Sequence, residues 1–160
     1  MSGPHDSGGA GSGLDERGLP PGKRIRAGME IGPIEARDLI AAAGARTDGA
    51  PVLVVDVREP DEWRICRIEG AVLVPLGEIE ERADEVLEMV EDLIEERVNQ
   101  RDSGSGIDAA TAPVVVYCHH GVRSLTATAL LQAKGLRGAR SMAGGIDLWS
   151  VAVDDGVARY

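Results

Sequence analysis

The residues with the clearest capacity for chemistry lie together at positions 118–124, which read Cys-His-His-Gly-Val-Arg-Ser. They follow an apolar run at residues 112–117 and precede an Ala/Leu-rich stretch at residues 125–134. This order predicts a buried strand, a tight loop that begins at Cys118, and a helix. Backbone N–H groups at a helix N-terminus, together with the helix dipole, favour an anion. A Cys118 thiolate held there would be a nucleophile at neutral pH.

The residues that follow this cysteine are not typical of a protein core. Gly121 allows the backbone to curl so that successive N–H groups converge on one point. Arg123 places a fixed positive charge near the sulfur, and Ser124 is positioned to cap the following helix. His119 and His120 are candidates for substrate contact or proton handling near neutral pH. An inert buried cysteine is the alternative, and the polar loop favours a reactive one.

Two further charged residues, Asp56 and Arg58, lie at the end of a second apolar run at residues 51–57. Sites in open parallel sheets form at the carboxyl ends of strands, so we expect both residues on the sheet edge that carries Cys118. Asp56 would bond N–H groups of the loop and Arg58 would add positive potential. A local salt bridge or turn cap is an equally good interpretation.

The remaining cysteine, Cys66, could form a disulfide with Cys118, but a half-buried small side chain is the favoured interpretation. Trp63 and Trp149 are interpreted as packing residues. The two cysteines and the adjacent His119 and His120 lack the ligand spacing of a zinc site, so no metal is expected.

Composition excludes several classes of protein. The formal net charge of -10 argues against nucleic-acid binding and against docking to an anionic membrane. There is no apolar run of about 18 residues, so no membrane span is expected. Residues 1–22 have no apolar segment typical of a secretory signal. Two cysteines cannot form a disulfide scaffold, which favours a reduced, cytoplasmic setting.

The chain length of 160 residues suggests one domain. Residues 1–22 are rich in Gly, Ser and Pro and are predicted to be a disordered tail, which leaves a domain at residues 23–160. In that domain strands alternate with helices, which predicts an α/β fold with a largely parallel sheet. A long helix is expected at residues 76–98. Its acidic face is either solvated or a docking surface for a basic partner.

The sequence resembles a single rhodanese-like domain from about Met29 to the C-terminus. Five stretches carry the resemblance, at residues 55–63 (Val-Asp-Val-Arg-Glu-Pro-Asp-Glu-Trp), 68–76, 115–124, 144–149 and 152–160. The last of these is similar to the tail of rhodanese domains attached to sulfur-carrier adenylyltransferases. Two features depart from the family pattern. The usual histidine and proline are missing from residues 66–71, and residues 76–110 form a longer connection.

The resemblance implies a three-layer fold, with helices on both sides of a central, largely parallel sheet. It also implies a sulfurtransferase. Cys118 would take a sulfane sulfur from a donor such as thiosulfate or a persulfide, hold it as a persulfide, and pass it to a thiol or sulfur-carrier acceptor. No cofactor is implied. The residues implied to bind substrate are His119, His120, Gly121, Val122, Arg123 and Ser124.

Two other functions remain open from the sequence. A non-catalytic binding or regulatory module is disfavoured because Cys118 and Arg123 are both present. A phosphatase or arsenate reductase is disfavoured because the related cell-cycle phosphatases have one more residue in the loop. The smaller cradle suits a sulfur atom better than a phosphoryl group with its three equatorial oxygens.

Overall fold

The computed structural model describes residues 13–45, 49–100 and 106–160. Within these ranges, five strands form one parallel sheet in the order β1-β5-β4-β2-β3. The strands are β1 (Glu30–Ile31), β2 (Leu53–Asp56), β3 (Val72–Leu73), β4 (Val114–Tyr117) and β5 (Ala139–Met142). The helices are α1 (Pro33–Ala45), α2 (Pro60–Ile65), α3 (Ala83–Asn99), α4 (Val122–Ala133) and α5 (Gly145–Ala152), with a 3₁₀ turn η1 (Leu76–Glu78).

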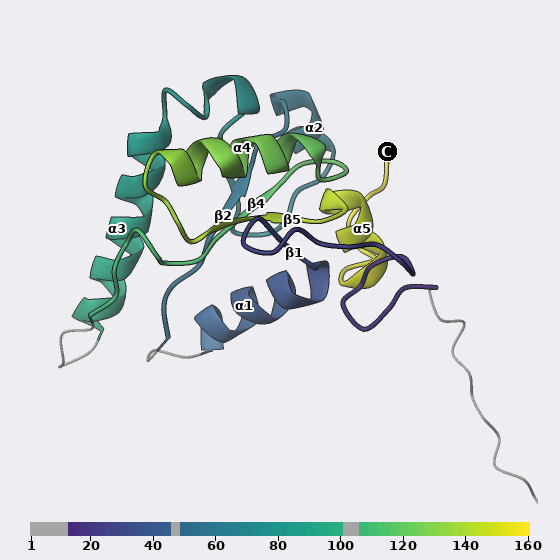
Figure 1. The fold of residues 1–160 in the computed structure, drawn as a ribbon, viewed down its shortest axis with the longest axis horizontal. Coiled ribbons are helices and arrows are strands. Elements are labelled where there is room, and N and C mark those ends of the chain that lie inside the picture. Colours follow the sequence, from purple (N-terminus) through teal and green to yellow (C-terminus); the bar gives the residue numbers. More distant parts are fainter. Residues whose placement is uncertain (1–12, 46–48, 101–105) are drawn as a thin grey trace, which may run out of the picture.

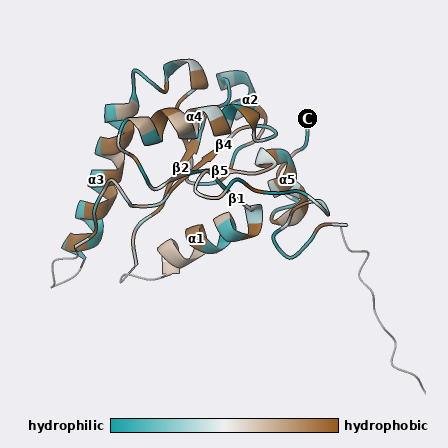
Figure 2. Ribbon diagram, viewed as in Figure 1, coloured by the Kyte–Doolittle hydropathy of each residue, from teal (hydrophilic) through white to brown (hydrophobic). Residues whose placement is uncertain are grey.

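Helices cover both faces of this sheet, so the protein has three layers (Figure 1). Helices α3 and α4 pack on one face, and α1 and α5 pack on the other. The expected three-layer α/β fold with a parallel sheet is confirmed. The apolar residues concentrate in the strands and on the inner faces of the helices, as the hydropathy colouring shows (Figure 2).

The central strand β4 is buried on both faces, which explains its unbroken apolar sequence. Side chains alternate across a strand, so Val114 and Val116 pack with α3 and α4. Val115 and Tyr117 point to the opposite face and pack with α1 and α5. Cys118 comes directly after the strand and joins the α3/α4 core. The fold therefore places its sulfur at the carboxyl end of the sheet, under the start of α4.

The helix expected at residues 76–98 is divided in two. Its first residues form η1, and α3 begins only at Ala83. Gly77 lies at the start of the expected helix and is a poor helix former. The predicted amphipathic character of α3 is present, because Val86 and Val90 are buried. The short helix α2 was not predicted from the sequence.

The segment before β1 corrects the expected domain boundary. Residues 1–12 lie outside the described residues, but part of the segment at residues 13–22 packs against the rest of the fold. Leu19 is fully buried, and the N–H of Ile34 donates to the carbonyl of Arg17 over 3.2 Å. Gly18 has a φ of +76° and fits closely against Pro33. Composition identified a Gly-rich stretch but could not reveal that Leu19 is buried and that Gly18 lies against Pro33 of α1 and Ala152 of α5.

None of the helices in the described ranges is long and apolar enough to span a membrane.

Candidate active site

The sulfur of Cys118 lies in a cradle of hydrogen-bond donors at the N-terminus of α4. The side chain is 1% exposed. Its Sγ accepts the backbone N–H of Gly121 over 3.1 Å and that of Ser124 over 3.3 Å. The hydroxyl of Ser124 lies 3.4 Å from the same sulfur. The predicted order of strand, loop and helix is therefore present, and two loop amides converge on the sulfur. Such an arrangement stabilises negative charge on a thiolate.

Glycines in the loop and in α5 give this cradle its shape. Gly121 has a φ of +97° and begins α4. Gly145 has a φ of +61°, and a Cβ atom there would overlap the carbonyl groups of Cys118 and His119. The same two carbonyls accept N–H groups from the start of α5, at 2.8 Å from Ile146 and 3.1 Å from Asp147. The paired glycines at residues 144–145 thus allow α5 to hold the loop from behind.

Ser124 does not cap α4 as expected, because its polar groups turn inward. Its hydroxyl lies 2.8 Å from the hydroxyl of Ser141, and both side chains are fully buried. Ser141 belongs to β5, where it pairs with Val116 of β4. Sequence reasoning missed Ser141, since only the register between β4 and β5 brings it under the loop.

Arg123 is held by a carboxylate that sequence reasoning also missed. Its guanidinium donates two hydrogen bonds to Glu62 of α2, at 2.7 and 2.8 Å. These bonds lower the pKa of Glu62 from 4.5 to about 2 and raise the pKa of Arg123. Among the described residues, no hydrogen bond joins Arg123 to the sulfur of Cys118. The Glu62 carboxylate therefore compensates most of the Arg123 charge beside the loop, which the sequence did not lead us to expect. Glu62 lies in the Asp-Glu-Trp sequence at residues 61–63, one of the stretches that carry the family resemblance.

Asp56 and Arg58 form a local salt bridge, the second of the two interpretations drawn from the sequence. Both side chains are fully buried, and Arg58 Nη2 lies 2.7 Å from Asp56 Oδ2. Asp56 also accepts the backbone N–H of Arg58, over 3.0 Å, rather than N–H groups of the loop. Arg58 donates further to the carbonyl of Cys66 at 2.6 Å and to the hydroxyl of Tyr160 at 2.8 Å. This pair therefore contacts Cys66 and Tyr160, and not the sulfur of Cys118.

The two histidines of the loop lie in different surroundings. The His119 ring stacks between His120 and Tyr160, with centroid distances of 3.9 and 4.0 Å. Burial, reinforced by the neighbouring His120, lowers the pKa of His119, which favours its neutral form. His120 is largely exposed, and its Nδ1 lies 4.0 Å from Asp147. Of the two, His120 is the more accessible to a molecule that approaches the loop.

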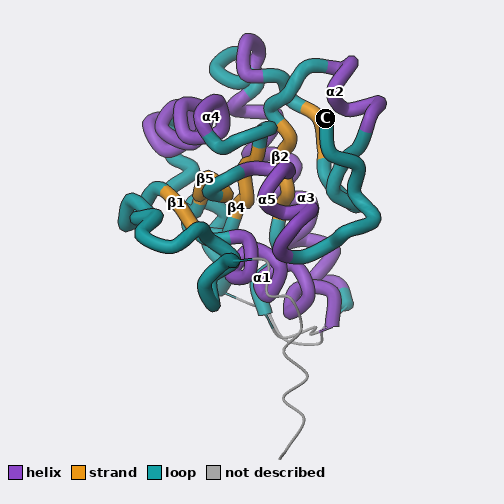
Figure 3. Tube along the Cα trace, turned by 90° about the vertical axis from the view of Figure 1, so that its right-hand side faces the viewer, coloured by secondary structure: helices purple, strands orange, loops and turns teal. Residues whose placement is uncertain are grey.

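Tyr160 was not predicted as a site residue, although it lies in a stretch that carries the family resemblance. Its hydroxyl donates to Glu62 over 2.9 Å and accepts from Arg58. Burial raises its pKa to about 12, so the hydroxyl stays protonated. The end of the chain lies near α2 (Figure 3).

Cys66 and the two tryptophans lie outside the cradle of Cys118. Cys66 is a free, half-buried thiol whose Sγ is 3.9 Å from Arg58. Trp149 is buried in the α1/α5 core, and half-buried Trp63 lies under the guanidinium of Arg67. Across the described ranges, no group of three His, Cys, Asp or Glu side chains could share a metal ion.

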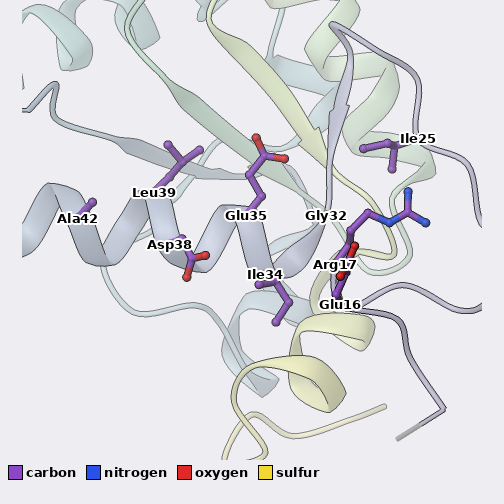
Figure 4. Close-up of a pocket in the computed structure, with 9 residues that line it drawn as sticks. All are labelled: Glu16, Arg17, Ile25, Gly32, Ile34, Glu35, Asp38, Leu39 and Ala42. Carbon is purple, nitrogen blue, oxygen red and sulfur yellow. The ribbon is translucent and has the colours of Figure 1, made fainter.

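A cavity of about 390 Å³ lies away from this site, between the N-terminal segment and α1 (Figure 4). Its lining includes Arg17, Ile25 and Leu39 but none of the site residues predicted from the sequence. It results from the way the segment packs on α1.

Comparison with known proteins agrees with the resemblance seen in the sequence. The family model described as "Rhodanese-like domain" matches residues 39–152. A relative named probable adenylyltransferase/sulfurtransferase MoeZ, from Mycobacterium tuberculosis, is 30% identical over 83% of this chain. Adenylyltransferase and sulfurtransferase MOCS3 from Oryza sativa is 31% identical over 70% of it. The chain spans only 27% and 23% of the lengths of these two relatives.

A solved structure of a single-domain relative is also similar. The human single domain sulfurtransferase TSTD1 superposes with a TM-score of 0.52 at 26% identity. The match covers 75% of this chain and 93% of the human one. The described fold therefore corresponds to a unit that also occurs as a single domain.

Proposed function

Because the chain belongs to the rhodanese-like domain family, we propose that it is a sulfurtransferase in which Cys118 carries the transferred sulfur. The relatives that are named sulfurtransferases support a role of this general type. The observation that carries the proposal is the cradle of Cys118. A buried sulfur that accepts two backbone N–H groups at the start of a helix is positioned as a stabilised thiolate.

In the first half of the reaction, the Cys118 thiolate attacks the sulfane sulfur of a donor. With thiosulfate, the S–S bond of the donor breaks, sulfite leaves with the bonding electrons, and Cys118 becomes a persulfide anion. In the second half, a thiolate acceptor attacks the outer sulfur and the Cys118 thiolate leaves. No net oxidation occurs and no cofactor is required.

The cradle supports both half-reactions because negative charge stays on sulfur throughout. The amides of Gly121 and Ser124 supply fixed donors that need no reorganisation, and the Ser124 hydroxyl can donate to the thiolate. The Glu62–Arg123 pair fixes the start of α4 against α2. A thiolate nucleophile of this kind suits a reducing compartment such as the cytoplasm, and thiols or sulfur-carrier proteins are the proposed acceptors.

Mass spectrometry of the intact protein after incubation with thiosulfate tests this function. We expect a gain of one sulfur atom, which maps to Cys118 and is removed by cyanide with formation of thiocyanate. Cys118→Ser should lose both the mass gain and the turnover. Cys66→Ser is the matched control, since it removes the other thiol, and it should retain most activity. An unmodified Cys118 in the presence of active enzyme would refute the assignment.

A further inference from the structure

One side chain, that of Tyr160, reaches both ends of the loop between Cys118 and Arg123. Its ring stacks on His119, the first residue after Cys118, with the ring centroids 4.0 Å apart and the ring planes at 12° to each other. Its hydroxyl donates to Glu62 over 2.9 Å. Glu62 in turn accepts two hydrogen bonds from Arg123. Tyr160 therefore contacts the start of the loop directly and the end of the loop through one carboxylate.

The Glu62 carboxylate is held on both of its oxygens by groups outside α4. Oε1 accepts the Tyr160 hydroxyl over 2.9 Å, and Oε2 accepts the backbone N–H of Glu59 over 3.0 Å. The two bonds from Arg123 also divide between these oxygens, at 2.8 Å on Oε1 and 2.7 Å on Oε2. An ionised carboxylate has about four acceptor sites, so all the sites of this one are used. The position of Arg123 is thus fixed from α2 and from Tyr160.

Tyr160 is itself anchored to a buried part of the fold. Its hydroxyl oxygen accepts a hydrogen bond from Arg58 over 2.8 Å, and Arg58 is fully buried in its salt bridge with Asp56. A hydroxyl that accepts from Arg58 has its single hydrogen free to donate to Glu62. Because Tyr160 is 42% exposed, these contacts, and not burial in the core, set the position of its side chain. Loss of the hydroxyl would therefore disconnect Glu62 from the anchored Arg58.

The backbone between the two ends of the loop depends on restraint from outside. The N–H groups of Gly121 and Ser124 both donate to the Cys118 sulfur, over 3.1 and 3.3 Å. Gly121 has a φ of +97° and no side chain, so its own conformation is weakly restrained. It lies between His119 and Arg123, the two fixed points. Displacement of either point would shift the amides relative to the sulfur.

On the basis of the proposed sulfurtransferase function, we propose that Tyr160 is a positioning residue for the transfer. It keeps the loop amides directed at the sulfur while Cys118 attacks the donor and while Cys118 carries the persulfide. Tyr160 makes none of the hydrogen bonds to this sulfur that the described residues provide, so it acts through His119 and Glu62. It also lies beyond residues 39–152, the part of the chain that the family model matches. The proposed role thus falls to the segment after α5.

Single-turnover kinetics of persulfide formation test this role in the full chain. The protein is mixed with thiosulfate, the reaction is quenched at increasing times, and the gain of one sulfur is followed by mass. The limiting rate and the half-saturating thiosulfate concentration are obtained separately. Tyr160→Phe removes only the hydroxyl and keeps the ring on His119, whereas Tyr160→Ala removes both contacts.

We expect Tyr160→Phe to lower the limiting rate about fivefold and Tyr160→Ala about thirtyfold, the sizes typical of one hydrogen bond and of a hydrogen bond plus a ring stack. Half-saturation should stay within about twofold of the parent, because Tyr160 affects the transition state rather than donor binding. The final mass gain should remain one sulfur per chain, which would show that the slow variants are folded.

A second comparison identifies the route of the effect. If the hydroxyl acts through Glu62, Tyr160→Phe should slow the reaction by less than about twofold in a Glu62→Ala background. Should Glu62→Ala fail to fold, Glu62→Gln keeps the size of the side chain and takes its place.

Tyr117→Phe is the matched control, since Tyr117 is the other tyrosine of the chain. Its buried hydroxyl accepts the N–H of Ile68 over 3.1 Å, a contact that involves neither the loop nor Glu62. Loss of this hydroxyl should lower the free energy of unfolding but leave the limiting rate within about twofold of the parent.

An unchanged limiting rate in Tyr160→Phe would overturn this inference and leave the proposed function intact. So would equal slowing by Tyr160→Phe with and without the Glu62 carboxylate, or equal slowing by Tyr117→Phe. If thiosulfate fails to load Cys118 in the parent protein, the proposed function and this inference are both refuted.

Discussion

Replacement of Gly145 by alanine should disturb the Cys118 loop from outside it. At this position the φ of +61° is strained for any residue with a Cβ atom, at a cost of about 1–2 kcal/mol. The new Cβ atom would also overlap the carbonyl groups of Cys118 and His119. These are backbone atoms, which cannot rotate away as a flexible side chain would. Overpacking of this kind typically costs about 1–3 kcal/mol.

The two costs together predict a loss of about 2–5 kcal/mol in the free energy of unfolding for Gly145→Ala. Urea denaturation of the folded protein measures it. Gly70→Ala is the matched control for backbone strain alone, because Gly70 has a φ of +81° but open space around its Cβ position. It should lose only about 1–2 kcal/mol. Gly77→Ala has neither strain nor overlap and should change stability by less than about 0.5 kcal/mol.

The same variant should lose sulfurtransferase activity beyond its loss of stability. Movement of the carbonyls breaks their hydrogen bonds with α5 and shifts the amide of Gly121 relative to the sulfur. Activity is to be measured at a temperature where each variant is fully folded. A Gly145→Ala protein as stable as Gly70→Ala, with full activity, would refute the claim that α5 positions the loop.

Two other predictions concern stability. Leu19→Ala should lower the free energy of unfolding by about 2–5 kcal/mol, because Leu19 is fully buried. Ile65→Ala, at a residue that is 53% exposed, is the control. A loss below about 1 kcal/mol for Leu19→Ala would show that the packing of Leu19 does not stabilise the fold. The pKa of Glu62 is lowered to about 2, so its bond to Arg123 stabilises the protein above pH 4.5 and is lost as the pH falls toward 2. Glu62→Gln should therefore be less stable than the parent by about 1–2 kcal/mol at pH 7, and the gap measured by urea denaturation should shrink by pH 3. A gap independent of pH would contradict the ionic origin of this stability.

The sequence alone predicted the strand, loop and helix around Cys118 because the signal is local. A β-branched run, a cysteine, a glycine and an Ala/Leu-rich helix follow one another within about twenty residues, and each sets the backbone of its own segment. The cradle around Cys118 is built within that short stretch. The family resemblance also depended on short motifs, and the three-layer α/β fold follows from the alternation of strands and helices.

Only the tertiary structure decided which groups surround the loop. Glu62 meets Arg123 across 61 positions, and Tyr160 meets Arg58 across 102. Ser141 reaches Ser124 through the register of β5 on β4. Contacts of this kind depend on the relative placement of distant elements, which no local pattern encodes.

The same reason explains the error at the N-terminus. Its composition predicts disorder when averaged over residues 1–22, yet a single leucine determines whether part of the segment packs. The burial of Leu19 depends on the distant elements around it: the neighbouring Gly18 lies against Pro33 of α1 and Ala152 of α5. Residues close to Cys118 in the sequence supply the N–H groups that its sulfur accepts. Packing between distant segments determines which charged side chains lie beside the loop.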